Sequence, residues 1–132
     1  MKILFLSLFC ALFITACTKN STTQPDITGI WTGKRVYNDG SSLDWCWDIK
    51  PNGEIYFYDS IAPKVYNFYP DDQGIWNLHN TTFRAAQMKG PGSPIPSYVD
   101  SASLSEGSRK MTGKQFYFRG GIPISSFTMT KK

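Results

Sequence analysis

The chain has 132 residues, which is enough for one domain of ordinary size and too short for two separate hydrophobic cores. Hydrophobic residues make up 41% of the chain and charged residues 18%, so the composition excludes an intrinsically disordered protein. The formal net charge is +4 and the cationic residues are scattered, so charge gives no reason to expect a nucleic-acid partner.

Residues 1–16 have the features of a secretory leader. Lys2 supplies the positive start, and residues 3–13 form an apolar run that is interrupted only by Ser7. This run is too short for a membrane-spanning helix, which needs about 20 apolar residues. The pattern therefore predicts a signal peptide that is removed from the mature protein.

The segment 14–17 reads Ile-Thr-Ala-Cys and resembles the lipobox of bacterial lipoproteins. The resemblance implies cleavage before Cys17 and the attachment of acyl chains, such as palmitate, to this residue. Two or more acyl chains hold a protein stably at a membrane. Thr18 follows the cysteine where inner-membrane lipoproteins tend to carry aspartate, so the resemblance implies the outer membrane and leaves its face open. The alternative is an ordinary signal peptide followed by a chance cysteine.

Residues 17–26 are the expected lipidated N-terminus and linker, because the stretch after Cys17 is polar and contains few apolar residues. Of the three cysteines, Cys10 lies in the leader and Cys17 is the expected acylation site. Cys46 would then be the one free thiol of the mature protein, and no intramolecular disulfide could form. We expect Cys46 to be a small packed residue.

From residue 26 onward, apolar and polar residues alternate in short runs that are separated by turn residues, and no window keeps helical spacing. Eight strands are predicted, at residues 27–37, 43–50, 54–59, 74–79, 81–89, 98–104, 111–119 and 126–131. A further edge strand at 64–69 stays open. The succession of hairpins predicts an all-β domain over residues 27–132, folded as a single eight-stranded antiparallel up-and-down barrel.

Four short motifs follow one another along this domain: Gly-Ile-Trp at 29–31, Trp-Cys-Trp-Asp-Ile-Lys-Pro-Asn-Gly at 45–53, Gly-Ile-Trp-Asn-Leu at 74–78 and Lys-Met-Thr-Gly at 110–113. Their order and spacing resemble those of lipocalins and of bacterial lipocalin-like lipoproteins. The resemblance implies a barrel in which Trp31 plugs the closed end. It also implies a late arginine stacked on that ring, for which Arg119 is the candidate.

Strand alternation predicts that five side chains share the inward side of the barrel: Trp45, Trp47, Phe57, Trp76 and Leu78. An eight-stranded barrel is either filled by its own side chains or just wide enough for one small ligand. The bulk of tryptophan favours a filled core. The same residues could also line a hydrophobic pocket, so both interpretations stay open.

The sequence offers little that is typical of an active site. His79 is the sole histidine, and neither a nucleophile elbow nor a glycine-rich phosphate loop is present. Asp44 and Asp48 would lie about 13 Å apart along an extended strand, too far for the carboxylate pair of a glycosidase. We therefore expect no enzyme activity, no cofactor and no bound metal.

These features together predict a lipid-anchored envelope protein whose barrel binds a small hydrophobic ligand. We expect a monomer that is held to the membrane through the acyl chains on Cys17. The alternative is a protein-interaction module, such as an envelope inhibitor or an accessory subunit of a surface complex, that uses the loops at 60–72 and 90–97. An open cavity of ~300 Å³ or more would favour the ligand, and a filled barrel with an exposed aromatic patch would favour the partner.

Overall fold

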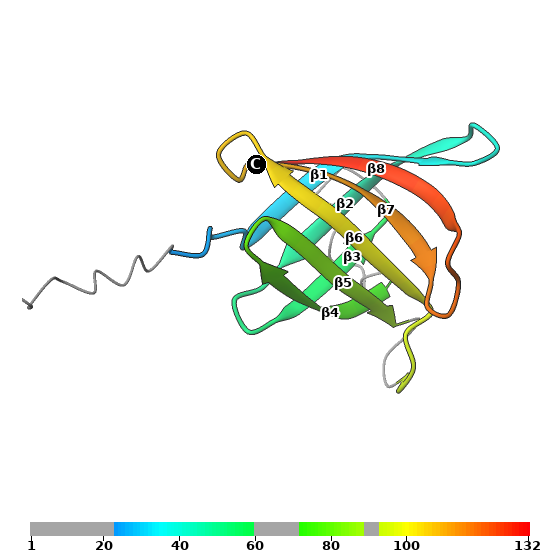
Figure 1. Cartoon of the computed structure of the whole chain (residues 1–132), viewed down its shortest axis with the longest axis horizontal. Helices are drawn as coiled ribbons and strands as arrows, with labels where there is room; N and C mark the ends of the chain where they lie inside the picture. Colours follow the sequence, from blue (N-terminus) through cyan, green and yellow to red (C-terminus); the bar gives the residue numbers. More distant parts are fainter. Residues whose placement is uncertain (1–22, 60–71, 89–92) are drawn as a thin grey trace, which may run out of the picture.

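The computed structural model describes residues 23–59, 72–88 and 93–132, and these form eight strands and no helix (Figure 1). The strands are β1 (Gly29–Tyr37), β2 (Ser42–Ile49), β3 (Glu54–Tyr58), β4 (Asp72–His79), β5 (Thr82–Met88), β6 (Tyr98–Ser105), β7 (Lys110–Tyr117) and β8 (Pro123–Lys131). The expected leader, the acylation site Cys17 and the possible edge strand at 64–69 lie outside the described residues.

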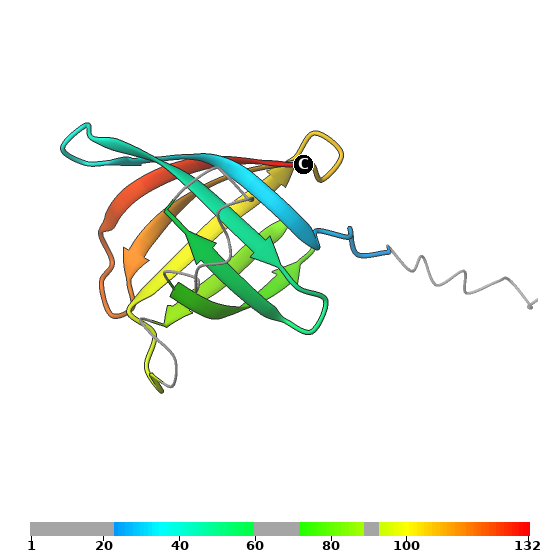
Figure 2. The ribbon, with the colours of Figure 1, turned by 180° about the vertical axis from the view of Figure 1, so that it is seen from behind.

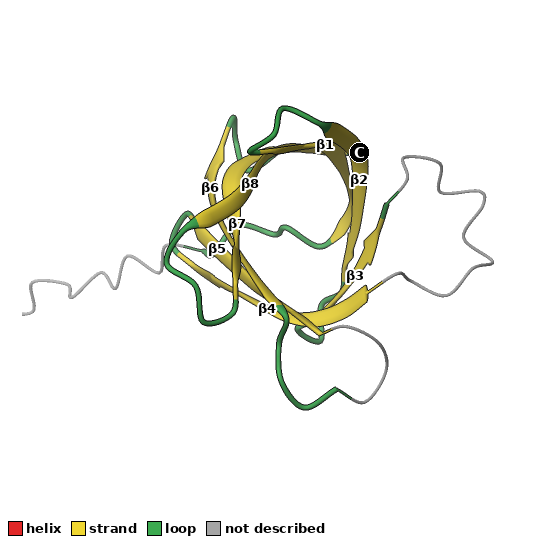
Figure 3. Cartoon of the chain, turned by 90° about the vertical axis from the view of Figure 1, so that its right-hand side faces the viewer, coloured by secondary structure: helices red, strands yellow, loops and turns green. Residues whose placement is uncertain are grey.

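The eight strands close into one antiparallel barrel, as the sequence predicts. Each strand pairs with the next along the chain, and β1 also pairs with β8. Figure 3 shows the resulting ring of strands. Closure leaves no strand at an edge, so the backbone groups that would invite pairing with another chain are bonded within the wall.

The last two strands differ from their predicted bounds. β7 ends at Tyr117, since the chain turns back there and the Gly120 amide donates to the Tyr117 carbonyl at 2.8 Å. β8 begins at Pro123, three residues earlier than expected. Proline lacks an amide hydrogen, and the first residue of a strand is a position that tolerates this loss.

The two ends of the barrel differ in their connections. We call one end the turn end: it holds the short turns at 50–53, 80–81 and 106–109, and the chain enters β1 there (left in Figure 1, right in Figure 2). We call the opposite end the loop end. Its described connections include residues 38–41 and 118–122, and β3 and β5 end there while β4 and β6 begin there.

A continuous apolar core fills the barrel from the turn end to its middle. Its fully buried large side chains include Trp31, Trp47, Phe83, Met111 and Met129. The indole nitrogen of Trp31 donates to the Ile27 carbonyl at 2.7 Å, and Ile27 is itself buried. Trp31 is therefore buried at the turn end of the barrel.

The expected stacking of Arg119 on Trp31 is wrong. Trp31 pairs with Lys131 and Trp47 at the turn end. Arg119 is exposed in the turn that follows β7, at the loop end. The expectation relied only on Arg119 being an arginine late in the sequence. Because β7 runs from the turn end to the loop end and stops at Tyr117, Arg119 lies at the opposite end of the barrel from Trp31.

Candidate functional site

The loop end of the barrel holds a cavity of about 630 Å³. This volume exceeds the ~300 Å³ at which sites for small molecules begin. Five of its lining residues are aromatic, namely Tyr37, Trp45, Phe57, Tyr98 and Tyr117. The polar lining residues include Arg35, Asp39, Asp59, Asp72, Gln87 and Gln115. The barrel thus has a filled half and a hollow half.

Arg35 forms the centre of the cavity floor. Strand alternation places it on the inward side of β1, two residues beyond Gly33 and four beyond Trp31, and only 7% of its surface is exposed. Its guanidinium carbon lies 4.3 Å from the centre of the Trp45 ring and 5.0 Å from that of Tyr37. A guanidinium is attracted to the face of an aromatic ring, so both rings stabilise the buried charge.

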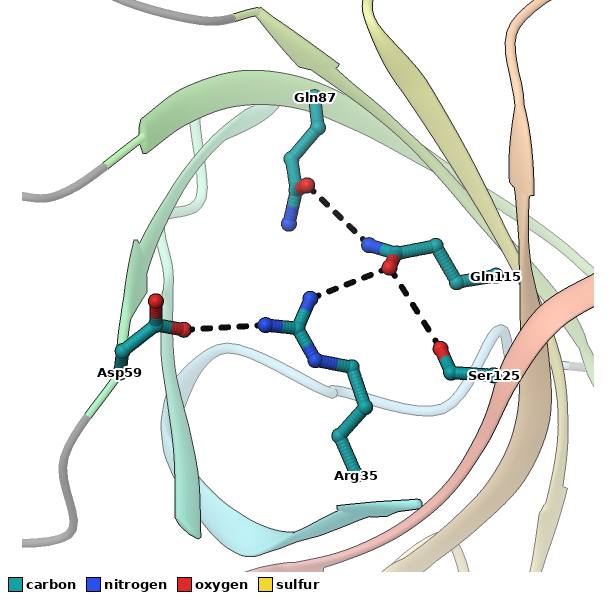
Figure 4. A network of polar contacts seen from close by, with 5 residues as sticks. All are labelled: Arg35, Asp59, Gln87, Gln115 and Ser125. Atoms are coloured by element: carbon teal, nitrogen blue, oxygen red, sulfur yellow. Dashed lines mark hydrogen bonds and ion pairs between the residues drawn. The ribbon is translucent and has the colours of Figure 1, made fainter. Parts of the chain in front are cut away.

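Hydrogen bonds hold the Arg35 guanidinium in place across the barrel (Figure 4). Nη1 donates to Oε1 of Gln115 at 3.1 Å, and Nη2 donates to Oδ1 of Asp59 at 3.2 Å. The amide nitrogen of Gln115 donates in turn to Oε1 of Gln87 at 3.2 Å, while the Ser125 hydroxyl donates to Oε1 of Gln115 at 3.5 Å. This polar network ties β1 to β5, β7, β8 and the residue that follows β3.

Asp100 lies against the network and is fully buried. In the sheet register it faces Gln115 of β7 and Ala85 of β5. Neither carboxyl oxygen accepts a hydrogen bond of ordinary geometry. Burial raises the pKa of Asp100 to about 8, and the positive charge of Arg35 and the nearby Gln115 side chain offset only part of that rise. A carboxyl group with this pKa is mostly neutral at pH 7.

The five predicted interior residues divide between the two halves. Trp45 and Phe57 line the cavity. Trp47 lies beneath them in the apolar core, with its ring centre 5.0 Å from those of Trp45 and Phe127. Trp76 and Leu78 are half-buried and pack against the core. The filled-core interpretation therefore describes the turn end, and the pocket interpretation describes the loop end.

Trp76 is held at the turn end by two contacts. Its ring stacks on Phe83 with centres 6.3 Å apart, and its indole nitrogen donates to the Lys50 carbonyl at 2.9 Å. The residue thus packs at the base of the hairpin between β2 and β3. This position separates it from the cavity.

Sequence reasoning missed the polar members of the site, although a signal for them is present. Gln87 is in phase with Phe83 on β5, and Gln115 is in phase with Met111 on β7. On each of these strands the inward positions change from apolar to polar toward the loop end. The missed side chains are Arg35, Gln87, Asp100, Gln115 and Ser125.

The remaining candidate residues lie away from the cavity. The Cys46 side chain is buried, as expected of a packed residue, and His79 is exposed at the end of β4. Within residues 23–59, 72–88 and 93–132, no group of three or more histidine, cysteine or carboxylate side chains could hold a metal ion. In the same ranges, no helix is long and apolar enough to cross a membrane.

Comparison with models of protein families gives no match to this chain, and comparison with the sequences of curated proteins gives none either.

Proposed function

We propose that this protein is a non-catalytic binding barrel that holds one small molecule in the cavity at its loop end. The observation that carries the proposal is a cavity of about 630 Å³ whose walls combine aromatic rings with a few convergent polar groups. Sites for small molecules have this composition, with apolar walls for affinity and few polar groups for orientation. The ligand is amphipathic rather than wholly hydrophobic, because the floor beneath the rings is the polar network around Arg35.

The proposal includes a place for the protein in the cell. Residues 1–16 act as a signal peptide, Cys17 carries the acyl chains, and the barrel belongs with the lipocalin-like lipoproteins of the bacterial outer membrane. The support for this part is the Ile-Thr-Ala-Cys segment and the four motifs along the barrel. A Cys17→Ser variant should move from the membrane to the soluble fraction; continued membrane association would contradict the anchor.

Binding is tested by closing the cavity. Ile124 lines it, whereas Ile122 is 78% exposed in the adjacent turn. The fluorescent probe 1-anilinonaphthalene-8-sulfonate should brighten with the wild-type protein, and Ile124→Trp should weaken its binding at least roughly fivefold by filling the space. Ile122→Trp is the matched control and should bind as the wild type does. Equal binding to all three proteins would contradict a site in the cavity.

One observation favours protein interaction as a second candidate function. Four large apolar side chains are exposed around the loop end: Ile95, Tyr117, Phe118 and Ile122. The Phe118 amide donates to the Ser97 carbonyl at 3.1 Å, so the two segments that carry them are neighbours. Exposed apolar patches often mark protein interfaces. Loss of a co-purifying partner in an Ile95→Ser, Ile122→Ser double variant, with unchanged probe binding, would support this candidate.

A further inference from the structure

The cavity has one cationic group among the described residues that line it. This group is the guanidinium of Arg35. A charge that is 7% exposed needs an anionic partner and acceptors for its N–H groups. The kind of ligand that fits this floor therefore depends on how many of these acceptors the protein itself provides.

The protein provides only some of the acceptors that the Arg35 guanidinium needs. Asp59 meets Arg35 through a single oxygen at 3.2 Å, and 54% of the Asp59 side chain is exposed. Nε of Arg35 is buried and donates to no acceptor. A carboxylate that meets a guanidinium through both oxygens forms two parallel hydrogen bonds and binds more strongly than one that meets it through one oxygen. Asp59 is therefore a partner that a better-placed carboxylate can replace.

The walls select a flat molecule. The rings of Tyr98 and Tyr117 lie 5.6 Å apart at the mouth, and Trp45 and Phe57 are stacked at the floor with centres 6.1 Å apart. Below them the space is taken by the core, in which Trp47 contacts Phe127. A long flexible chain has no room to extend past the floor into the filled half of the barrel. A planar ring system, in contrast, can lie among the tyrosine rings of the cavity.

The rim limits the total charge of the ligand. Asp39 is exposed, and hydrogen bonds from the Ser41 amide and hydroxyl lower the pKa of its carboxyl, so it stays ionised at neutral pH. Asp72 lines the same cavity. The carboxylate of Asp39 repels a second negative charge near the mouth, so the site fits one acidic group placed at the depth of Arg35.

We propose that the cavity binds a planar aromatic molecule with one carboxylate, which takes the place of Asp59 on the guanidinium of Arg35. This inference rests on the proposed function and narrows it to one class of ligand. The ring system lies among Tyr37, Tyr98 and Tyr117, and the carboxylate accepts hydrogen bonds from the guanidinium. Asp59 is released toward solvent when the ligand enters.

The test uses three probes of equal shape and different charge: 2-naphthoate, 2-naphthalenemethanol and 2-naphthylmethylammonium. Their dissociation constants are measured by isothermal titration calorimetry on the full-length protein in detergent. We expect naphthoate to bind about tenfold more tightly than the alcohol, since a hydrogen bond to a charged group is worth more than a neutral one. The ammonium probe should bind most weakly.

Two variants that each remove one carboxylate distinguish the displacement of Asp59 by the ligand from the general effect of losing one negative charge. Asp59→Asn removes the competitor and should tighten naphthoate about fivefold while leaving the alcohol unchanged. Asp26→Asn removes an equal charge from an exposed residue at the turn end that does not line the cavity, and should change naphthoate binding by less than about twofold. If Asp59→Asn weakens naphthoate instead, Asp59 positions Arg35 and is not exchanged, and the proposal is wrong. Arg35→Gln should abolish the preference for naphthoate, provided that the variant folds.

The outcomes also separate this inference from the proposed function. Equal binding of naphthoate and the alcohol, or tighter binding of the ammonium probe, overturns the acidic ligand and keeps a binding barrel. Failure of all three probes to bind overturns both.

Discussion

Trp47 and Arg35 lie on neighbouring strands and face the same interior, yet they are held by opposite means. Trp47 is surrounded by the rings of Trp45, Phe57, Phe83 and Phe127, with centres between 5.0 and 5.8 Å away. Arg35 is held by an amide, a carboxylate and two ring faces. The turn-end half therefore supplies most of the stability, because it is filled with apolar side chains. The loop-end half is less densely packed, because it contains the cavity and its polar lining.

The largest expected effect tests the filled half. Trp47→Ala removes a fully buried ring and should lower the free energy of unfolding by roughly 3 to 5 kcal/mol, as large-to-small core substitutions do. Urea denaturation followed by circular dichroism measures the change. Ile75→Ala, at an exposed position of β4, is the control and should stay within about 0.5 kcal/mol of wild type. Similar losses for both would mean that the apolar core does not dominate stability.

The next prediction concerns Asp100 and the pH dependence of stability. Its pKa rises from an ordinary value of 3.8 to about 8 in the folded protein. Between these values the folded state keeps a proton that the unfolded state has lost, so the free energy of unfolding falls as the pH rises from about 4 to about 8. Asp100→Asn removes this loss and should stabilise the protein by roughly 2 to 4 kcal/mol at pH 7.

The same variant has a built-in control, since its advantage over wild type should disappear below about pH 3, where the carboxyl is protonated in both states. The comparison variant Asp39→Asn should show no gain between pH 6 and pH 8, because the pKa of Asp39 is lowered and the group is ionised throughout that range. A wild-type stability that stays flat from pH 4 to pH 8 would contradict a neutral buried Asp100.

The smallest expected effect concerns the amide at the centre of the network. Gln115→Leu removes one hydrogen bond each from Arg35, Gln87 and Ser125 and should destabilise the protein by roughly 1 to 3 kcal/mol. Ser125→Ala removes one bond of 3.5 Å and should cost less than about 1 kcal/mol. Thermal unfolding of both variants checks the order. A larger loss for Ser125→Ala would show that Gln115 is not the centre of the network.

The sequence was sufficient to predict the wall of the barrel. The run at 43–50 becomes β2, and Trp45, Trp47 and Ile49 are buried on its inward side, because strand geometry alternates side chains with a fixed period. The hairpins follow from turn residues such as Asn80, which adopts a φ of 55° between β4 and β5. Local rules of this kind need no knowledge of the tertiary structure.

The site was predictable only in part. Alternation along the strands identified Trp45 and Phe57 as inward residues, but it did not identify Arg35. Arginine is rarely buried. Its burial here becomes understandable only in the folded barrel, where Asp59 and Gln115 accept hydrogen bonds from it. These residues are 24 and 80 positions away in the chain. Arg119 was misplaced for the same reason, since its end of the barrel depends on where β7 stops.

The pairing of β1 with β8 has a consequence for how the barrel folds. Trp31 faces Lys131, and the Lys132 amide donates to the Ile30 carbonyl at 3.0 Å. The seam of the ring thus joins the first described strand to the last. Until these two strands pair, each exposes unpaired backbone along one side, and a chain in this state is more prone to aggregate than the closed ring.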